Sequence, residues 1–65
     1  MCNEQIAKKL VELRGDRSQN EVATAVGVSV SAIAMYESGQ RIPRDEIKIR
    51  IAEYYGVGVA DIFCQ

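Results

Sequence analysis

The chain has 65 residues, with eight lysines and arginines against nine aspartates and glutamates, and a net charge of −1. A chain of this length folds as one domain with a small core and buries about 60% of its surface, so residues 1–65 are expected to form a single domain. With two cysteines, Cys2 and Cys64, and no histidine, the chain lacks the four ligands of a structural zinc site. No apolar run approaches the roughly 20 residues of a membrane span, and no signal-peptide pattern opens the chain. We therefore expect a cytoplasmic protein with free thiols, although a Cys2–Cys64 disulfide is compatible with the sequence.

Glycines divide the chain into five short apolar-periodic segments. Gly15, Gly27, Gly39 and Gly56 each follow such a segment, where glycine can adopt the left-handed conformation that ends a helix. No segment has the turn chemistry of a β-hairpin. The pattern predicts an all-α fold with helices over about 3–14, 18–26, 29–38 and 44–55, and a last turn over about 59–64.

The fourth segment permits two interpretations. The run from Ile47 to Ile51 alternates apolar and charged residues with period 2, as a half-buried strand would. A lone strand would have no partner here, whereas Ile47, Ile51, Ala52 and Tyr55 form one face of a helix. We therefore predict a helix, with Ile49 pointing away from its buried face.

The segment from Ser18 to Tyr36 encodes two short helices joined by a glycine turn. Ser18 to Glu21 fit the capping box S-x-x-E, in which the serine hydroxyl accepts from the Glu21 amide while the glutamate reaches back to the Ser18 amide. Gly27 makes the turn, and Ser29 is the next N-cap. In this arrangement a helix-turn-helix offers its second helix to the DNA major groove.

A helical wheel divides this second helix into two faces. Ile33 marks the core side, together with Tyr36 and Glu37. The opposite face is small, uncharged and partly apolar, and it contains Ser31, Ala34, Met35 and Ser38, with Val30 at its edge. Two interpretations remain open at this point: a face covered by a ligand, and a bland solvated surface.

Several motifs together resemble the Cro-type, lambda-repressor-like helix-turn-helix family, also called the XRE family. They are SQ-x-EVA, GVS, Y-E-S-G-Q-R-x-P, and IA-x-x-YGV followed by DIF. The match covers about Ile6 to Phe63. The resemblance implies a compact five-helix bundle that binds double-stranded operator DNA, usually as a two-fold dimer, with repression of transcription as the expected role.

The resemblance also implies roles for individual residues. Base-reading positions match Val30, Ser31 and Met35, with Ala34 beside them, while Arg14 and Glu37 match a structural salt bridge. Positions that contact the DNA backbone match Gln19, Ser38, Gln40 and Arg41. Asn20 and Arg44 are further candidates for phosphate contacts.

Two positions depart from the family pattern. Arg17 stands where a leucine is more common, which points it to DNA or solvent. Arg44 replaces the usual small N-capping residue, so Asp45 is expected to cap the fourth helix.

Dimerisation is expected to use Ile49, with Ile62 and Phe63 near the C-terminus, although core packing explains the last two at least as well.

The rival class is a protein-interaction module of the antitoxin or adaptor type, which the acidic net charge and the bland helix face support. The chain has no histidine, P-loop or clustered acid pair, and a bundle this small lacks room for a ligand cavity of roughly 300 Å³. We therefore expect no enzymatic activity, cofactor, metal or small-molecule ligand.

Overall fold

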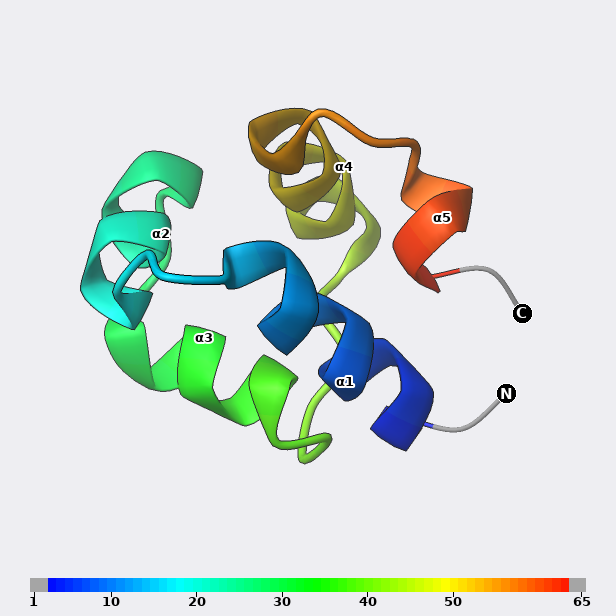
Figure 1. Cartoon of the computed structure of the whole chain (residues 1–65), viewed down its shortest axis with the longest axis horizontal. Helices are drawn as coiled ribbons and strands as arrows, with labels where there is room; N and C mark the ends of the chain where they lie inside the picture. The colour runs from blue at the N-terminus through cyan, green and yellow to red at the C-terminus, as the bar shows by residue number, and fades with distance from the viewer. Residues whose placement is uncertain (1–2, 64–65) are drawn as a thin grey trace.

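The computed structural model describes residues 3–63, which form five helices and contain no strand. In chain order the helices are α1 (Asn3–Arg14), α2 (Gln19–Val26), α3 (Val30–Glu37), α4 (Asp45–Tyr55) and α5 (Val59–Phe63). The predicted all-α fold is therefore confirmed, while Cys2 and Cys64 lie outside the described residues. Figure 1 shows α3 along the lower edge of the molecule, α2 at one end, and α4 and α5 on the opposite side of α1. No helix within residues 3–63 is both long and apolar enough to cross a membrane.

Local sequence signals explain where α2 and α3 begin and why the chain turns between them. The Ser18 hydroxyl accepts a hydrogen bond from the Glu21 amide at 3.0 Å, and the Ser29 hydroxyl accepts one from the Ala32 amide at 3.0 Å. The reciprocal bond from the Ser18 amide to the Glu21 carboxylate is not formed within the described residues. Gly27 has a φ of 88°, a left-handed conformation that a side chain would strain, and its amide donates to the last turn of α2.

The fourth helix begins one residue later than predicted and without the expected cap. Arg44 occupies the N-cap position, and its side chain makes no capping bond. The prediction that Asp45 caps α4 is wrong, because Asp45 is already the first helical residue and its carboxylate instead lies 3.7 Å from the Lys48 ammonium. The helix interpretation of this segment is confirmed, and Ile49 points away from the core with 49% of its surface exposed.

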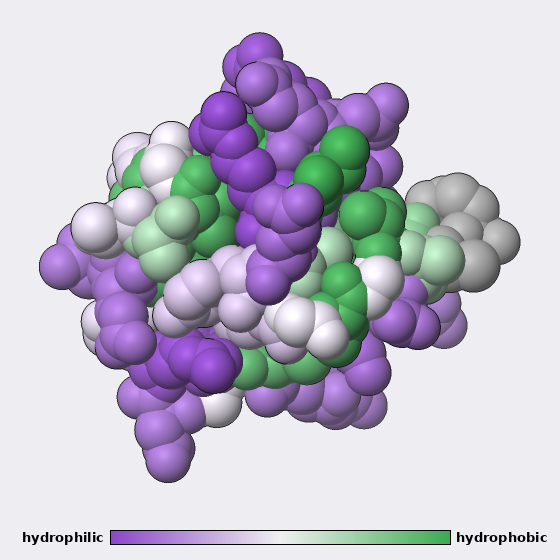
Figure 2. Space-filling model, turned by 90° about the horizontal axis from the view of Figure 1, so that it is seen from above, coloured by the Kyte–Doolittle hydropathy of each residue, from purple (hydrophilic) through white to green (hydrophobic). Residues whose placement is uncertain are grey.

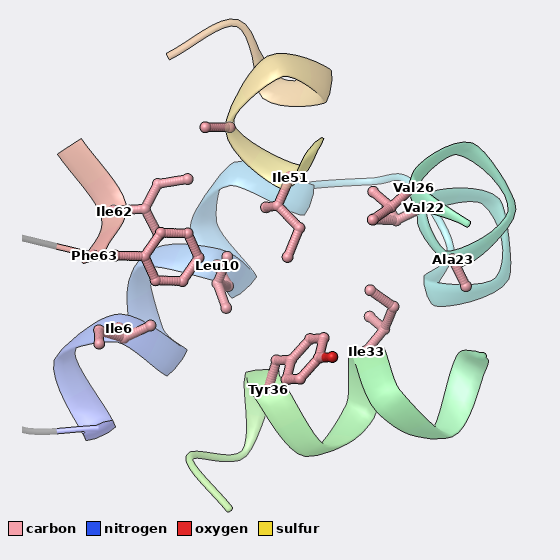
Figure 3. Close-up of a cluster of buried hydrophobic side chains, with 11 residues drawn as sticks. Ile6, Leu10, Val22, Ala23, Val26, Ile33, Tyr36, Ile51, Ile62 and Phe63 are labelled. Atoms are coloured by element: carbon pink, nitrogen blue, oxygen red, sulfur yellow. The ribbon is translucent and has the colours of Figure 1, made fainter. Parts of the chain in front are cut away.

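The core lies where α1, α3 and α4 meet. Figure 3 shows Ile33 and Tyr36 pointing from α3 toward Leu10 of α1 and Ile51 of α4, and all four side chains are buried. Val22, Ala23 and Val26 of α2 close the same cluster from one end. Because Ile33 and Tyr36 both face inward, the opposite side of α3 is left to the surface.

The C-terminal helix completes this core. Ile62 and Phe63 are only 5% and 4% exposed, and the Lys48 ammonium lies 5.5 Å from the centre of the Phe63 ring. The expectation that Ile62 and Phe63 form a dimer interface is therefore wrong, because both side chains are used within one copy of the chain. Ile49 alone of the three expected interface residues is exposed.

Candidate nucleic-acid interface

The outward side of α3 carries the four residues that the sequence predicted as base readers: Val30, Ser31, Ala34 and Met35. We call these four the reading face. Val30 is 41% exposed, Ser31 is also exposed, and Ala34 and Met35 are half-buried. In Figure 1 no other helix lies below α3, so this side of the helix is open.

The polar side chains that flank the reading face are already engaged within the protein. Ser29 caps α3, and the Ser38 hydroxyl donates to the Met35 carbonyl at 3.2 Å. Glu37 is held by partners from two other helices. Ser31 is consequently the one polar side chain of α3 that faces solvent without a hydrogen-bond partner in the described part of the chain.

Glu37 joins α1, α2 and α3 through its two carboxylate oxygens. Oε2 accepts from Arg14 Nε at 2.8 Å, and Oε1 accepts from Gln19 Nε2 at 2.9 Å. The side chains of Arg14 and Glu37 are only 22% and 6% exposed. The hydrogen bond to Glu37, together with the negative charge of that carboxylate, raises the pKa of Arg14. We call Arg14, Gln19 and Glu37 the Glu37 cluster.

The Glu37 cluster contains the salt bridge that the resemblance implied and one bond that sequence reasoning missed. The Gln19–Glu37 bond joins residues 18 positions apart, and nothing local in the sequence indicates it. One N–H of the Gln19 amide is used in this bond, whereas a second N–H and the amide oxygen remain. Asn20 lies exposed beside Gln19 in the first turn of α2. The start of α2 thus offers two polar side chains close to one another.

The loop that follows α3 gathers two arginines. Arg41 and Arg44 are exposed, and neither forms an ion pair within residues 3–63. Together with Tyr36 and Ile42 they line a surface hollow of about 280 Å³. Gln40 is exposed in the same loop. Two arginines around one hollow suit an anion such as a phosphate group.

Arg17 is exposed, as the sequence predicted, but its side chain also contacts other parts of the chain. Its guanidinium lies 5.3 Å from the centre of the Tyr54 ring and 5.6 Å from that of Tyr55, and its Nη1 donates to the Leu13 carbonyl at 3.1 Å. The expectation that Arg17 reaches DNA or solvent missed these contacts, because the tyrosines are far from it in sequence. Burial, with a further contribution from the negative charge of Glu37, raises the pKa of Tyr55 to about 12.

Within residues 3–63, no three Cys, His, Asp or Glu side chains lie close enough together to hold a metal ion. The chemistry available at this surface is hydrogen bonding, positive charge and apolar contact.

The structure has two capped helices, α2 and α3, which are joined by a glycine in the left-handed conformation, and the outward side of α3 is open. This arrangement defines a helix-turn-helix protein. The chain belongs to the helix-turn-helix family, which matches residues 6–62. It is also similar to the cryptic phage CTXphi transcriptional repressor RstR of Vibrio cholerae, with 34% identity over 58 residues. That alignment covers 86% of this chain and 52% of the repressor, so the chain spans about half the length of this curated relative.

Proposed function

We propose that this protein is a sequence-specific DNA-binding transcriptional repressor that lays α3 into the major groove. The observation that carries the proposal is the open reading face on α3, followed in the next loop by two arginines that have no ion pair in the described residues. The similarity to a phage repressor supports the same role.

Phosphate contacts would set the position of α3 on the duplex. Gln19 and Asn20, with the first amides of α2, would meet one backbone strand, while Gln40, Arg41 and Arg44 meet the DNA backbone beyond the end of α3. Ser38 is expected to contribute least, because its hydroxyl must release the Met35 carbonyl before it can donate to a phosphate.

Base contacts would come from the reading face. Val30, Ala34 and Met35 can make only apolar contacts, for which the thymine methyl is the suitable group in the major groove, and Ser31 can pair with several base edges. No Arg, Asn or Gln lies on this face to form a bidentate contact. We expect operators with thymines at the contacted positions, modest specificity, and additional selectivity from DNA shape.

Dimerisation would place two copies of α3 about 34 Å apart on one side of the duplex. Ile49 lies on α4 and is 49% exposed. Figure 2 views the molecule from above, and on this face a band of hydrophilic residues separates the hydrophobic ones. We propose that Ile49 contributes to the dimer contact. Ile49→Glu should shift the sedimentation profile toward the monomer, whereas Val11→Glu, at a position with 43% exposure on α1, should not. An unchanged profile for Ile49→Glu would refute this interface.

Salt dependence separates DNA binding from the rival protein-interaction role. If Arg41 and Arg44 of each protomer neutralise one phosphate each, a dimer releases about four counterions, and log K falls against log salt with a slope of about −3.6. Raising the salt from about 50 to about 200 mM would then weaken binding about 150-fold. Association through apolar surface would change little over this range.

A mobility-shift experiment with DNA from upstream of the protein's own gene and with genomic fragments tests the proposal directly. Arg41→Gln should reduce the magnitude of the salt slope by about 1.8 in a dimer. Arg50→Gln is the matched control, because it removes the same charge from a side chain that already pairs with Glu46 at 3.5 Å. If no fragment is retarded at low ionic strength, the proposed function is wrong.

A further inference from the structure

The reading face has almost no capacity to distinguish bases by hydrogen bonding. Val30 and Ala34 carry no donor or acceptor, the Met35 thioether is only a weak acceptor, and the polar neighbours Ser29, Glu37 and Ser38 are engaged within the protein. Ser31 contributes a single hydroxyl, which can either donate or accept. What this face can detect on a base edge is therefore chiefly an apolar group.

The apolar group that unmodified DNA presents in the major groove is the C5-methyl of thymine. A cytosine methylated at C5 carries the same group on the same ring carbon. The two bases differ at ring position 4, where thymine has a carbonyl oxygen and cytosine an amino group. A protein can distinguish the carbonyl of thymine from the amino group of 5-methylcytosine only with a group that is always a donor or always an acceptor. The Ser31 hydroxyl is not such a group, because it can rotate to donate to the carbonyl or to accept from the amino group.

We propose that the reading face recognises a C5-methyl group irrespective of the base that bears it, so that 5-methylcytosine replaces thymine at the contacted positions. DNA methylated at cytosine C5 is then a ligand of this protein, and cytosine methylation within a suitable sequence creates or strengthens a binding site. This inference rests on the proposed DNA-binding function and extends it to modified DNA.

The magnitude follows from the burial of one methyl group. Burying a group of this size contributes the equivalent of about a fourfold gain in affinity for each methyl contacted. Thymine should therefore bind about fourfold more tightly than uracil at a contacted position, and 5-methylcytosine about fourfold more tightly than cytosine. Changing an A·T to a G·C pair also alters the shape of DNA, so the comparison is made within each base rather than between bases.

The first experiment compares two random DNA pools that carry the C5-methyl group on different bases. One pool contains thymine and cytosine, and a second contains uracil and 5-methylcytosine in their places. Selection with the chain of residues 1–65 should give a motif with thymine in the first pool and with 5-methylcytosine at the same positions in the second. Recovery of uracil at those positions instead would overturn the proposal.

The second experiment measures binding to single duplexes that carry thymine, uracil, cytosine or 5-methylcytosine at each selected position. The thymine-to-uracil and 5-methylcytosine-to-cytosine affinity ratios should be equal and about four. Methylation of a cytosine outside the selected positions is the matched control and should leave the affinity unchanged.

The outcomes separate this inference from the function on which it rests. Specific binding with both ratios close to one would overturn methyl recognition and leave the DNA-binding function standing. Failure to bind any duplex would overturn both. Met35→Gln should lower the two ratios together at the position that Met35 contacts, whereas Val11→Gln, at an exposed apolar position on α1 outside the reading face, should preserve them, and a thermal melt verifies that both variants are folded.

Discussion

Replacing Glu37 by glutamine tests whether the Glu37 cluster holds the helix-turn-helix unit on the rest of the bundle. Glu37 accepts from Arg14 through one oxygen and from Gln19 through the other. A glutamine has nearly the same shape, and its oxygen can still accept from Arg14 while the Gln19 amide turns to accept from its NH₂ group. Both hydrogen bonds can therefore form, but Arg14 loses the negative charge that compensates its own.

The expected cost follows from the burial of this pair. Glu37 is 6% exposed, so water does not compensate the missing negative charge, whereas Arg14 at 22% retains some access to solvent. Hydrogen bonds to charged groups contribute about 1.5–3 kcal/mol, and we expect a loss of about 2 kcal/mol, below the figure for a fully buried pair. For a domain of this size that loss lowers Tm by roughly 8–16 °C.

Thermal unfolding followed by circular dichroism measures this effect. Glu12→Gln is the matched control, because Glu12 lies exposed on the same helix as Arg14 and its carboxylate has no partner within residues 3–63. The control should change the free energy of unfolding by less than about 0.5 kcal/mol. If Glu37→Gln lowers Tm no more than Glu12→Gln does, the Glu37 cluster makes no net contribution to stability and the reasoning fails.

Two further predictions concern the contact between the α1–α2 turn and the end of α4. Arg17→Ala removes the guanidinium from the rings of Tyr54 and Tyr55 and should lower the free energy of unfolding by about 0.5–1 kcal/mol. Chemical denaturation measures this change, and an unchanged midpoint would show that the contact contributes nothing to stability. The pKa of Tyr55 rises from 10.0 to about 12 on folding, so the folded state favours the neutral phenol. The free energy of unfolding should therefore be constant near neutral pH and fall as the pH increases from about 10 to 12. Tyr55→Phe should reduce this fall relative to the parent chain, and equal alkaline curves for the two proteins would contradict the assignment.

The parts of the fold that could be predicted from sequence depend on local signals. Caps such as Ser29 act within one helical turn, and the periodic apolar residues mark each buried face, so helices and turns were identified closely. The Gln19–Glu37 bond and the stacking of Arg17 on two tyrosines depend on how distant helices pack, which periodicity does not encode. Ile62 illustrates the same limit, because its apolar character indicates that it will be buried but does not specify what covers it.

If the protein binds DNA as proposed, the small hydrogen-bonding capacity of the reading face predicts that specificity, like affinity, depends on two copies of the chain. If Val30, Ala34 and Met35 each contact one methyl at about fourfold, one protomer prefers its site about 60-fold and a dimer about 4,000-fold. Specific DNA-binding proteins prefer their sites by about 10³–10⁷, so only the dimer enters this range. Ile49→Glu should therefore reduce the ratio of operator to random-DNA affinity toward about 60-fold, measured by competition in mobility-shift experiments. A monomeric Ile49→Glu variant that retained the full ratio would show that one copy of α3 reads DNA through contacts other than these methyls.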